Sequence, residues 1–321
     1  MEHVLVTGST GYIGSHICKQ LKQQGYGVVG VDRMPPADWD IYSKYVDYHY
    51  EWEYDDVRLQ RVILNHKITR VVHTAATSLV GPSIKDPDTY YFNNVDTMHH
   101  FLRICRDSDI ERIVYSSSAA VYGDGYSVFD ETIAPRPINP YGRTKLAGEW
   151  LIEDYCRAYD MSAVALRYFN VCGADSEGEF GQRAKPTHII SVGLTRALKG
   201  ESITINGDDF DTADGTCERD YVHVVDVARA NVAALDAPVD TFAAVNIGTG
   251  VGYSNLQIVE AINTYTKHKL FFNVGPGRPG DPASLICNND QAKQLLKWQP
   301  ECSDLKTIIQ SAAAWHERNT V

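Results

Sequence analysis

The stretch VLVTGSTGYIGSH, residues 4–16, decides the fold. A short apolar strand pattern leads into three glycines, Gly8, Gly11 and Gly14, and apolar residues with helical spacing then continue to Leu21. In a strand–turn–helix unit the first glycine permits the tight turn, the second lets backbone approach a pyrophosphate, and the third lets the helix pack on the sheet. The helix N-terminus then faces the anion. The stretch therefore predicts a dinucleotide-binding unit.

The residues after the next strand pattern select the dinucleotide. That pattern, Val28–Val31, is followed by Asp32 at the spacing expected for a carboxylate that binds the ribose 2′-hydroxyl of NAD. The neighbouring Arg33 could instead accept the 2′-phosphate of NADP. Because Asp32 would repel that phosphate, we expect NAD as the cofactor.

Strand and helix patterns alternate through the first half of the chain. Val71-Val72 and Ile113–Tyr115 read as further strands, and Asn94–Cys105 reads as a helix between them. Strands that alternate with helices predict an α/β fold with a Rossmann-type doubly wound parallel sheet. Beyond residue 166 the elements become shorter. We expect an NAD-binding domain at 1–166, with segments around 220–250 returning to it, and a smaller C-terminal α/β substrate lobe at 167–321.

Composition excludes several classes of partner. The chain has 321 residues, a formal net charge of −11 and seven cysteines. The acidic balance argues against nucleic acid or an anionic membrane surface. The cysteines show no paired spacing, as in reduced cytosolic proteins, and no apolar run approaches the ~20 residues of a membrane span. We expect a cytoplasmic protein without a targeting segment, and no spacing of His, Cys and acidic residues indicates a metal site.

A second motif, NPYGRTKLAGE, places a tyrosine and a lysine four residues apart at the start of a helix. Asn139 suits the N-cap and Pro140 the first helical position, so Tyr141 and Lys145 share one helix face. A free tyrosine, with a pKa of ~10, is a poor base, but a nearby cation can lower that pKa by ~1 to 3 units. The pair can therefore supply a phenolate. On spacing alone, an exposed amphipathic helix that carries a tyrosine and a lysine by chance is the better explanation.

Other motifs in the sequence decide whether Tyr141 and Lys145 form a catalytic pair or merely lie on an exposed helix. VYSSSAAVYG ends a strand pattern and carries Ser118, which can reach a substrate hydroxyl beside the phenol. With these motifs the chain resembles the extended short-chain dehydrogenase/reductase (NAD-dependent epimerase/dehydratase) superfamily, and within it the UDP-glucose (UDP-galactose) 4-epimerases. The resemblance runs from Val4 to about Trp298 through TGSTGYIGSH, YYFNNV, SSSAAVYG, PYGRTK, RYFNVCGAD, DGTCERDYVHVVDVA and NIGTG.

The resemblance implies a redox-neutral cycle on a UDP-sugar with tightly held NAD. Tyr141 would remove the sugar O4 proton while hydride leaves C4, and hydride would return to the other face of the rotated 4-keto sugar. Ser118 would hydrogen-bond O4 and relay the proton, and Lys145 would hold the nicotinamide ribose and lower the tyrosine pKa. The implied cofactor-binding residues are Gly8, Gly11, Tyr12, Ile13, Gly14, Asp32, Arg33, Thr74, Ala75, Ala76, Asn93, Ser116, Tyr141, Lys145 and Phe169. The implied substrate-binding residues are Ser118, Tyr141, Asn170, His188, Arg219, Arg278, Asp281 and Leu285.

Several positions depart from the family pattern. The stretch HYEWEYDD leaves Trp52, Asp55 or Asp56 at the usual adenine contact. Ser78 replaces a frequent lysine, and Asn206 stands where an aromatic residue often lies against uracil. The sixth residue counted from the glycine of GDPASL is a leucine where a tyrosine would exclude an N-acetyl group, so acetylated UDP-sugars could be accepted.

Other functions remain open at this stage. A nucleotide-sugar 4,6-dehydratase would need an acid and a base directly after the active-site serine, where this chain has Ala119 and Ala120. A reductase with the same triad, or an NAD-binding sensor or scaffold without activity, would also fit the fold. The sugar could be glucose, N-acetylglucosamine or glucuronate. We expect a homodimer through a four-helix bundle built from the helices at 94–105 and 141–155, the arrangement that the resemblance implies.

Overall fold

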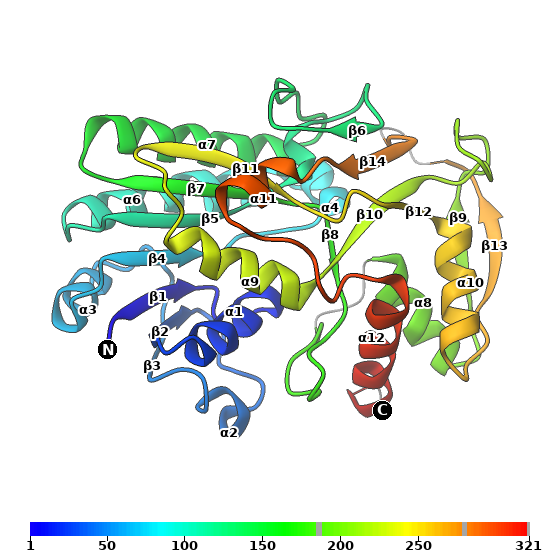
Figure 1. Ribbon diagram of the computed structural model, residues 1–321, viewed down its shortest axis with the longest axis horizontal. Helices are drawn as coiled ribbons and strands as arrows, with labels where there is room; N and C mark the ends of the chain where they lie inside the picture. The colour runs from blue at the N-terminus through cyan, green and yellow to red at the C-terminus, as the bar shows by residue number, and fades with distance from the viewer. Residues whose placement is uncertain (184–187, 278–280, 320–321) are drawn as a thin grey trace.

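The computed structural model describes residues 1–183, 188–277 and 281–319. Its centre is a seven-stranded sheet in the order β11-β7-β5-β4-β1-β2-β3, and every neighbouring pair is parallel (Figure 1). The strands are β1 (His3–Thr7), β2 (Gly27–Asp32), β3 (Tyr48–Glu51), β4 (Arg70–His73), β5 (Arg112–Ser118), β7 (Ser162–Tyr168) and β11 (Phe242–Ile247). This order confirms the doubly wound Rossmann-type fold.

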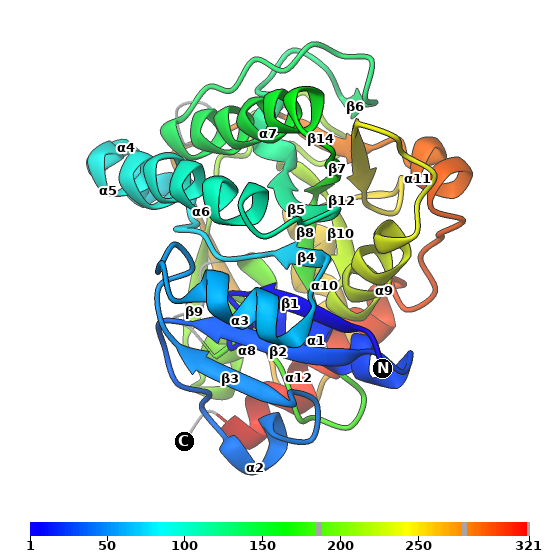
Figure 2. The ribbon, with the colours of Figure 1, turned by 90° about the vertical axis from the view of Figure 1, so that its left-hand side faces the viewer.

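Helices cover both faces of this sheet (Figure 2). Valines of β1 point to the face covered by α1 (Tyr12–Gln23) and α9 (Val224–Leu235), and Leu5 between them points to the other face. The second face is covered by α3 (Leu59–His66), α6 (Thr97–Arg106) and α7 (Pro140–Ala158). Because both faces are buried, β1, β2, β4 and β5 each contain a run of apolar residues, and these four strands were identified from the sequence.

Short elements connect the layers, and some of them were not expected. They are α2 (Trp39–Tyr42), α4 (Val80–Lys85), α5 (Pro87–Tyr91), the π-helical turn η1 (Phe92–Asp96) and the 3₁₀ turn η2 (Ala119–Val121). The helix expected from residue 94 therefore begins as a π-helical turn that continues into α6. The sequence analysis missed β3 because this edge strand buries none of its four residues deeply and shows no apolar face.

The C-terminal part forms smaller sheets beside the first one. A five-stranded sheet contains β6 (Val128–Phe129), β8 (Asn170–Cys172), β10 (Glu218–His223), β12 (Gly252–Ser254) and β14 (Ser284–Cys287). A two-stranded sheet pairs β9 (Ser202–Asn206) with β13 (Phe271–Gly275). The helices are α8 (Ile189–Leu198), α10 (Asn255–Tyr265), α11 (Asp290–Leu295) and α12 (Leu305–Asn319). The helices α8, α10 and α12 share one apolar core.

A buried ion pair fixes α7 on the sheet. The Glu149 carboxylate accepts two hydrogen bonds from the Arg167 guanidinium, at 3.0 and 2.6 Å, and both side chains are almost fully buried. Ser117 on β5 donates to the same carboxylate at 2.5 Å, and Arg167 also donates to the Tyr122 hydroxyl at 2.9 Å. A bidentate pair of this kind defines one register, because a displaced partner would leave a buried charge alone at a cost of about 3 to 5 kcal/mol.

None of the helices in the described parts of the chain has the length and apolarity that crossing a bilayer requires.

Candidate active site

A cavity of about 640 Å³ opens at the carboxyl ends of the central strands. In an open α/β sheet this edge is where ligands bind. Nine of the expected cofactor residues line the cavity. They are Gly8, Gly11, Tyr12, Asp32, Arg33, Thr74, Ala75, Ala76 and Asn93. The cavity therefore collects residues that lie far apart in the sequence at one strand edge.

The glycines leave the space that a pyrophosphate needs. Gly8 has a φ of +70°, in the region that favours glycine. Gly11 caps α1 without a side chain, so the helix N-terminus lies open towards the cavity. A Cβ at Gly14 would lie only 2.0 Å from the carbonyl oxygen of Gly8, so this position requires glycine for helix packing. The local structure fits a bound dinucleotide.

Asp32 is held in place by two backbone amides. Its carboxylate accepts hydrogen bonds from the amides of Thr10 at 3.1 Å and Met34 at 3.0 Å. A carboxylate offers about four lone-pair sites, so acceptor capacity remains for a ribose diol. Arg33 lies 3.8 Å from the Glu53 carboxylate, and both side chains are exposed. An acidic partner beside Arg33 makes this end of the cavity still less suited to the 2′-phosphate of NADP.

The structure reduces the number of candidate residues for the contact with the adenine of NAD. Of the three residues considered from the sequence, Trp52 lines the cavity. Asp55 lies 3.7 Å from His100, and Asp56 forms an ion pair with Arg58 at 2.5 Å. Sequence analysis missed Glu53, which lines the cavity beside Trp52. The alternation of β3 could have indicated that side chains near its end face this edge.

A more distant segment closes part of the cavity and was also missed. Phe180, Gly181 and Arg183 line it, although they come after β8, far from the glycine motif in the sequence. No local pattern marks these residues as cofactor contacts. Only the tertiary path of the chain brings them there.

The proposed base lies in the first turn of α7. The Asn139 side chain caps this helix by accepting from the Gly142 amide at 2.8 Å, and the Tyr141 amide donates to Ser83 Oγ at 3.2 Å. Burial raises the pKa of Tyr141, a hydrogen bond with Ser118 lowers it, and the nearby Tyr90 raises it again, so the net shift is upward. The structure thus brings Ser118 and Tyr141 together, as expected.

Lys145 is buried one turn further along α7. Its ammonium donates to the carbonyl oxygen of Ser116 at 2.8 Å and lies 5.0 Å from the centre of the Tyr115 ring. Burial lowers the pKa of Lys145 to about 7, and the negative charge of Glu149 acts in the opposite direction. In this structure the ammonium is directed to a backbone carbonyl and burial dominates at Tyr141, so a lowering of the tyrosine pKa by Lys145 stays a prediction for the enzyme with bound NAD.

The remaining cofactor residues take two kinds of position. Asn93, in the π-helical turn, donates to Thr77 Oγ1 at 2.9 Å. Ser116 Oγ lies 3.0 Å from the Tyr168 hydroxyl. Ile13, Gly14, Ser116, Tyr141, Lys145 and Phe169 are not among the residues that line the cavity. Gly14 and Phe169 instead belong to the packed support behind the site.

The expected substrate residues come from the smaller sheets. Arg219 on β10 donates to the carbonyl oxygen of Pro282 at 2.9 Å and lies 3.9 Å from Asp281. Leu285 stands opposite Arg219 in the β10–β14 register and is half-buried. Asn170 begins β8, which pairs with the second half of β10, whereas β12 and β14 pair with its first half.

The other two expected substrate residues are His188 and Arg278. His188 occupies the N-cap of α8 and is exposed. Arg278 lies outside the described residues, so the second arginine expected for a diphosphate has no structural description here. The structure therefore brings Arg219, Asp281 and Leu285 together, and no contact between His188 and this group is present among the described residues.

A cluster of three acidic residues could at first sight hold a metal ion. The carboxylate oxygens of Asp175, Glu177 and Glu179 lie within 4.8 Å of one another. The ammonium of Lys19 donates to all three, so a protein cation already fills the centre of this cluster.

Fold and site together define a class of enzyme. A glycine-rich turn at the edge of a doubly wound sheet and a Ser/Tyr/Lys group beside it are the elements of a dinucleotide-dependent enzyme that transfers hydride and protons. Over residues 4–248 the chain matches the model of the NAD dependent epimerase/dehydratase family. The protein belongs to this family.

Known proteins similar to this chain have consistent descriptions. A UDP-glucose 4-epimerase of Halalkalibacterium halodurans is 39% identical over 98% of this chain and 96% of its own length. The crystal structure of a UDP-glucose 4-epimerase from Brucella ovis in complex with NAD has a TM-score of 0.92 and 38% identity, covering 98% of both chains. The UDP-Glc/GlcNAc 4-epimerase from Campylobacter jejuni has a TM-score of 0.85 and 32% identity, covering 99% of this chain and 100% of that one.

The pKa of Lys145 predicts a pH-dependent stability. Its ordinary value is 10.5 and its folded value about 7, so the desolvation cost of the ammonium is fully present below pH 7 and disappears as the pH rises towards 10.5. Lys145→Met should therefore raise the melting temperature of the cofactor-free protein most at pH 7 and below. The advantage should shrink between pH 8 and 10.

Thermal unfolding of both proteins across this pH range measures the effect. The exposed Lys293→Met is the control, and its difference from the wild type should not vary with pH. A Lys145→Met difference that stays constant over the range would contradict a lowered lysine pKa.

Proposed function

We propose that this protein is an NAD-dependent UDP-sugar 4-epimerase that interconverts UDP-glucose and UDP-galactose through a transient 4-keto sugar. The observation that carries the proposal is that Ser118, at the carboxyl end of β5, and Tyr141 lie close enough for Ser118 to affect the pKa of Tyr141, at the sheet edge where a cavity that fits a dinucleotide opens. The near full-length similarity to UDP-glucose 4-epimerases supports the same conclusion. Bound NAD supplies the hydride acceptor and donor for sugar C4.

The chain's own residues move and hold the proton. Tyr141 accepts the O4 proton and later returns it, and Ser118 hydrogen-bonds O4 so that the proton passes along a short path. Lys145 is buried with a single backbone acceptor, so its ammonium can turn to a ribose hydroxyl and then bring positive charge towards the phenol. A cation close to the phenol favours the phenolate, and this effect offsets the rise in the pKa of Tyr141 that burial causes.

The two parts of the chain take different ligands in this proposal. Residues 1–166, with returning segments around 220–250, bind NAD, and residues 167–321 mainly bind the UDP-sugar. The strand β7 continues to Tyr168, so the division falls at the end of that strand. Arg219 and Asp281 would hold the diphosphate and ribose side of the nucleotide, and Asn170 would lie nearby on β8, which pairs with the second half of β10.

Elimination of water is disfavoured by the residues after Ser118. Ala119 and Ala120 form the first positions of η2 and carry no acid or base, which a 4,6-dehydratase needs there. The proposal is tested by incubating the protein with UDP-glucose or UDP-galactose, without added NAD, and following C4 epimers by NMR. Accumulation of a 4-keto-6-deoxy sugar, or turnover that consumes NADH stoichiometrically, would replace epimerase with dehydratase or reductase.

Tyr141→Phe removes only the oxygen that carries the proton. We expect the rate of epimerisation to fall by about 10² to 10⁴, the range for loss of a general base, with NAD binding and folding retained. The exposed Tyr159→Phe, at the end of the same helix, is the control. Near wild-type turnover in Tyr141→Phe would remove this residue from the mechanism.

The size of Leu285 bears on the choice of sugar. Leu285 packs against the cluster that contains Ala119 and Phe169, next to the strand end that carries Ser118. We propose that leucine, which is smaller than tyrosine, leaves room for an N-acetyl group. A similar structure, that of the Campylobacter jejuni enzyme, is described as a UDP-Glc/GlcNAc 4-epimerase, so a member of the family can act on an acetylated sugar. The same NMR assay with UDP-glucuronate tests whether that sugar is also accepted.

Leu285→Tyr should fill that room. We expect turnover of UDP-N-acetylglucosamine to fall by about tenfold or more, while turnover of UDP-galactose changes little, because a steric pocket discriminates by this order. Kinetics with both substrates measure the ratio. An equal loss on both would mean that Leu285 is only a packing residue.

We also propose a cytoplasmic homodimer. All seven cysteines are unpaired, as in a reducing compartment. Of the apolar residues expected at the interface, Phe101, Leu102 and Leu146 are buried within their own subunit, because α6 and α7 use those faces to cover the sheet. Trp150 on α7 is 59% exposed and remains as the candidate interface residue.

Trp150→Glu should therefore weaken assembly. Light scattering at micromolar concentration should give a dimer for the wild type and a monomer for the variant, because a charge in an apolar contact is costly. The exposed Trp39→Glu, on α2, is the control and should stay dimeric. A monomeric wild type would overturn the dimer.

A further inference from the structure

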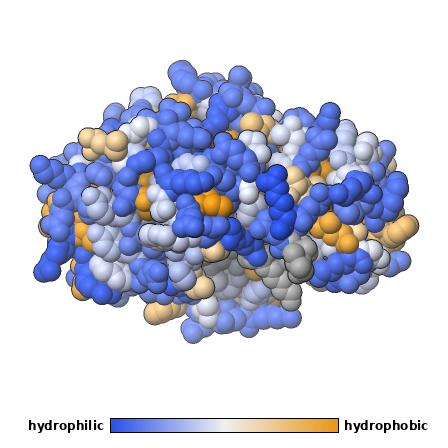
Figure 3. All heavy atoms as spheres, turned by 90° about the horizontal axis from the view of Figure 1, so that it is seen from below, coloured by the Kyte–Doolittle hydropathy of each residue, from blue (hydrophilic) through white to orange (hydrophobic). Residues whose placement is uncertain are grey.

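The segment Gly173–Arg183, here called the clamp, connects the smaller sheets with the cofactor cavity. It follows β8 and runs beside α1 and α12, as the green loop at the lower centre of Figure 1. Phe180, Gly181 and Arg183 at its end line the cavity together with the glycine-rich turn. The face on which the clamp lies is mostly hydrophilic (Figure 3). The clamp thus forms one wall of the cavity at the protein surface.

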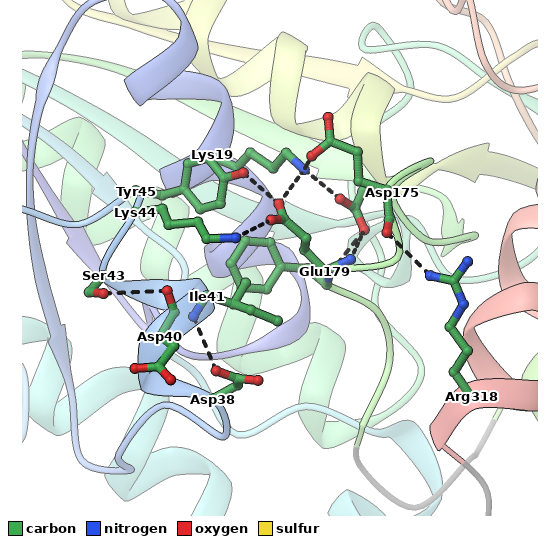
Figure 4. A network of polar contacts seen from close by, with 12 residues as sticks. Lys19, Asp38, Asp40, Ile41, Ser43, Lys44, Tyr45, Asp175, Glu179 and Arg318 are labelled. Carbon is green, nitrogen blue, oxygen red and sulfur yellow. Dashed lines mark hydrogen bonds and ion pairs between the residues drawn. The ribbon is translucent and has the colours of Figure 1, made fainter.

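Lys19 on α1 holds the clamp through three carboxylates. Its ammonium donates to Asp175 at 2.5 Å, to Glu177 at 2.8 Å and to Glu179 at 2.8 Å. Figure 4 shows the lysine entering between Asp175 and Glu179. Asp175 also accepts from the amides of Glu179 and Phe180, at 2.8 and 2.9 Å, so the charge contact and the clamp backbone form one unit.

Further contacts attach the clamp on both sides. Glu179 accepts from Lys44 at 2.9 Å and from the Tyr45 hydroxyl at 2.5 Å, both just after α2 (Figure 4). Phe180 packs edge-on against the Tyr45 ring, at 5.7 Å between centroids. On the other side, Arg318 of α12 donates to the carbonyl oxygen of Glu177 at 3.2 Å. These contacts orient the clamp, but Lys19 is the one residue in the described part of the chain that reaches all three carboxylates.

Removal of the Lys19 charge would turn the attraction between α1 and the clamp carboxylates into repulsion among those carboxylates. Burial lowers the pKa of Lys19, but its hydrogen bonds to Asp175, Glu177 and Glu179 outweigh burial and raise the pKa above its ordinary value, so the ammonium stays charged. Without it, three carboxylates within 4.8 Å would repel one another, and among the described residues the exposed Lys44 is the other ammonium paired with them. The clamp would then separate from α1.

We propose that Lys19 is the latch that keeps NAD in its cavity, so that the dinucleotide is released only when the clamp leaves α1. The inference rests on the proposed use of NAD. It deepens that proposal, because an epimerase must retain the reduced cofactor until hydride has returned to the sugar, and loss in mid-cycle would strand a 4-keto product. Lys19 is a positioning residue: it acts on the cofactor through Phe180, Gly181 and Arg183.

The test measures release of the cofactor rather than turnover. Purified protein is loaded with NADH, excess NAD is added, and the decay of protein-bound NADH fluorescence gives the release rate. Lys19→Met should release NADH about tenfold faster or more, as expected for the loss of charge-assisted hydrogen bonds, and should be purified with less bound NAD. Lys19→Arg should restore slow release.

Lys22→Met is the matched control. Lys22 lies on the same helix and forms an equally short ion pair, to Asp47 at 2.5 Å, but that pair lies outside the clamp. Its release rate should equal that of the wild type. Equal acceleration in Lys22→Met would mean that α1 is merely destabilised, and an unchanged rate in folded Lys19→Met would also overturn the latch.

A second variant, Glu179→Gln, tests the proposal if Lys19→Met does not fold. Glu179→Gln keeps the shape of the side chain but weakens its contacts with Lys19, Lys44 and Tyr45, and it should also accelerate release. An unchanged rate would contradict the proposal. Because NADH release is measured without a sugar, the latch can stand even if epimerisation fails, whereas a wild type that does not bind NADH would overturn it.

Discussion

The buried pair of Glu149 and Arg167 is the interaction on which the active-site geometry depends. It joins α7 to β7 through two hydrogen bonds between side chains that are almost fully buried. Tyr141 and Lys145 lie on the same helix, so the register set by this pair decides where the phenol and the ammonium stand relative to Ser118. The charge of Glu149 also opposes the desolvation of Lys145. One carboxylate thus contributes to both helix position and lysine protonation.

Much of the fold and of the central site could be predicted because the relevant physics is local. The glycine turn, the carboxylate after the second strand and the capped helix that begins with Asn139 each occupy a short stretch of chain. Their roles follow from backbone strain, helix termini and side-chain spacing, which a sequence displays directly. Parallel strands buried on both faces are equally visible, because they contain runs of apolar residues.

The contacts of Phe180 with the cavity and the burial of Tyr141 could not be predicted, because both depend on residues that are distant in the sequence. Phe180 lines the cavity on a segment that the ion pair of Lys19 and Asp175, 156 residues apart, joins to α1. No short pattern encodes such a contact. Burial is also a tertiary property, and this is why the sequence suggested a lowered pKa for Tyr141 where the structure shows a raised one. The helix faces of Phe101 and Leu146 were ambiguous in the same way, since a periodic apolar face does not say which partner it covers.

The two buried lysines show how the surroundings give one residue type two functions. Lys19 has three carboxylates, which keep it charged and fixed to the clamp. Lys145 donates to one carbonyl oxygen, and burial outweighs the opposing charge of Glu149, so its pKa falls to about 7. A lysine held by three anions is suited to fasten a segment. A lysine with one weak partner and a pKa near neutrality can change partner and charge state, which a proton-transfer site requires.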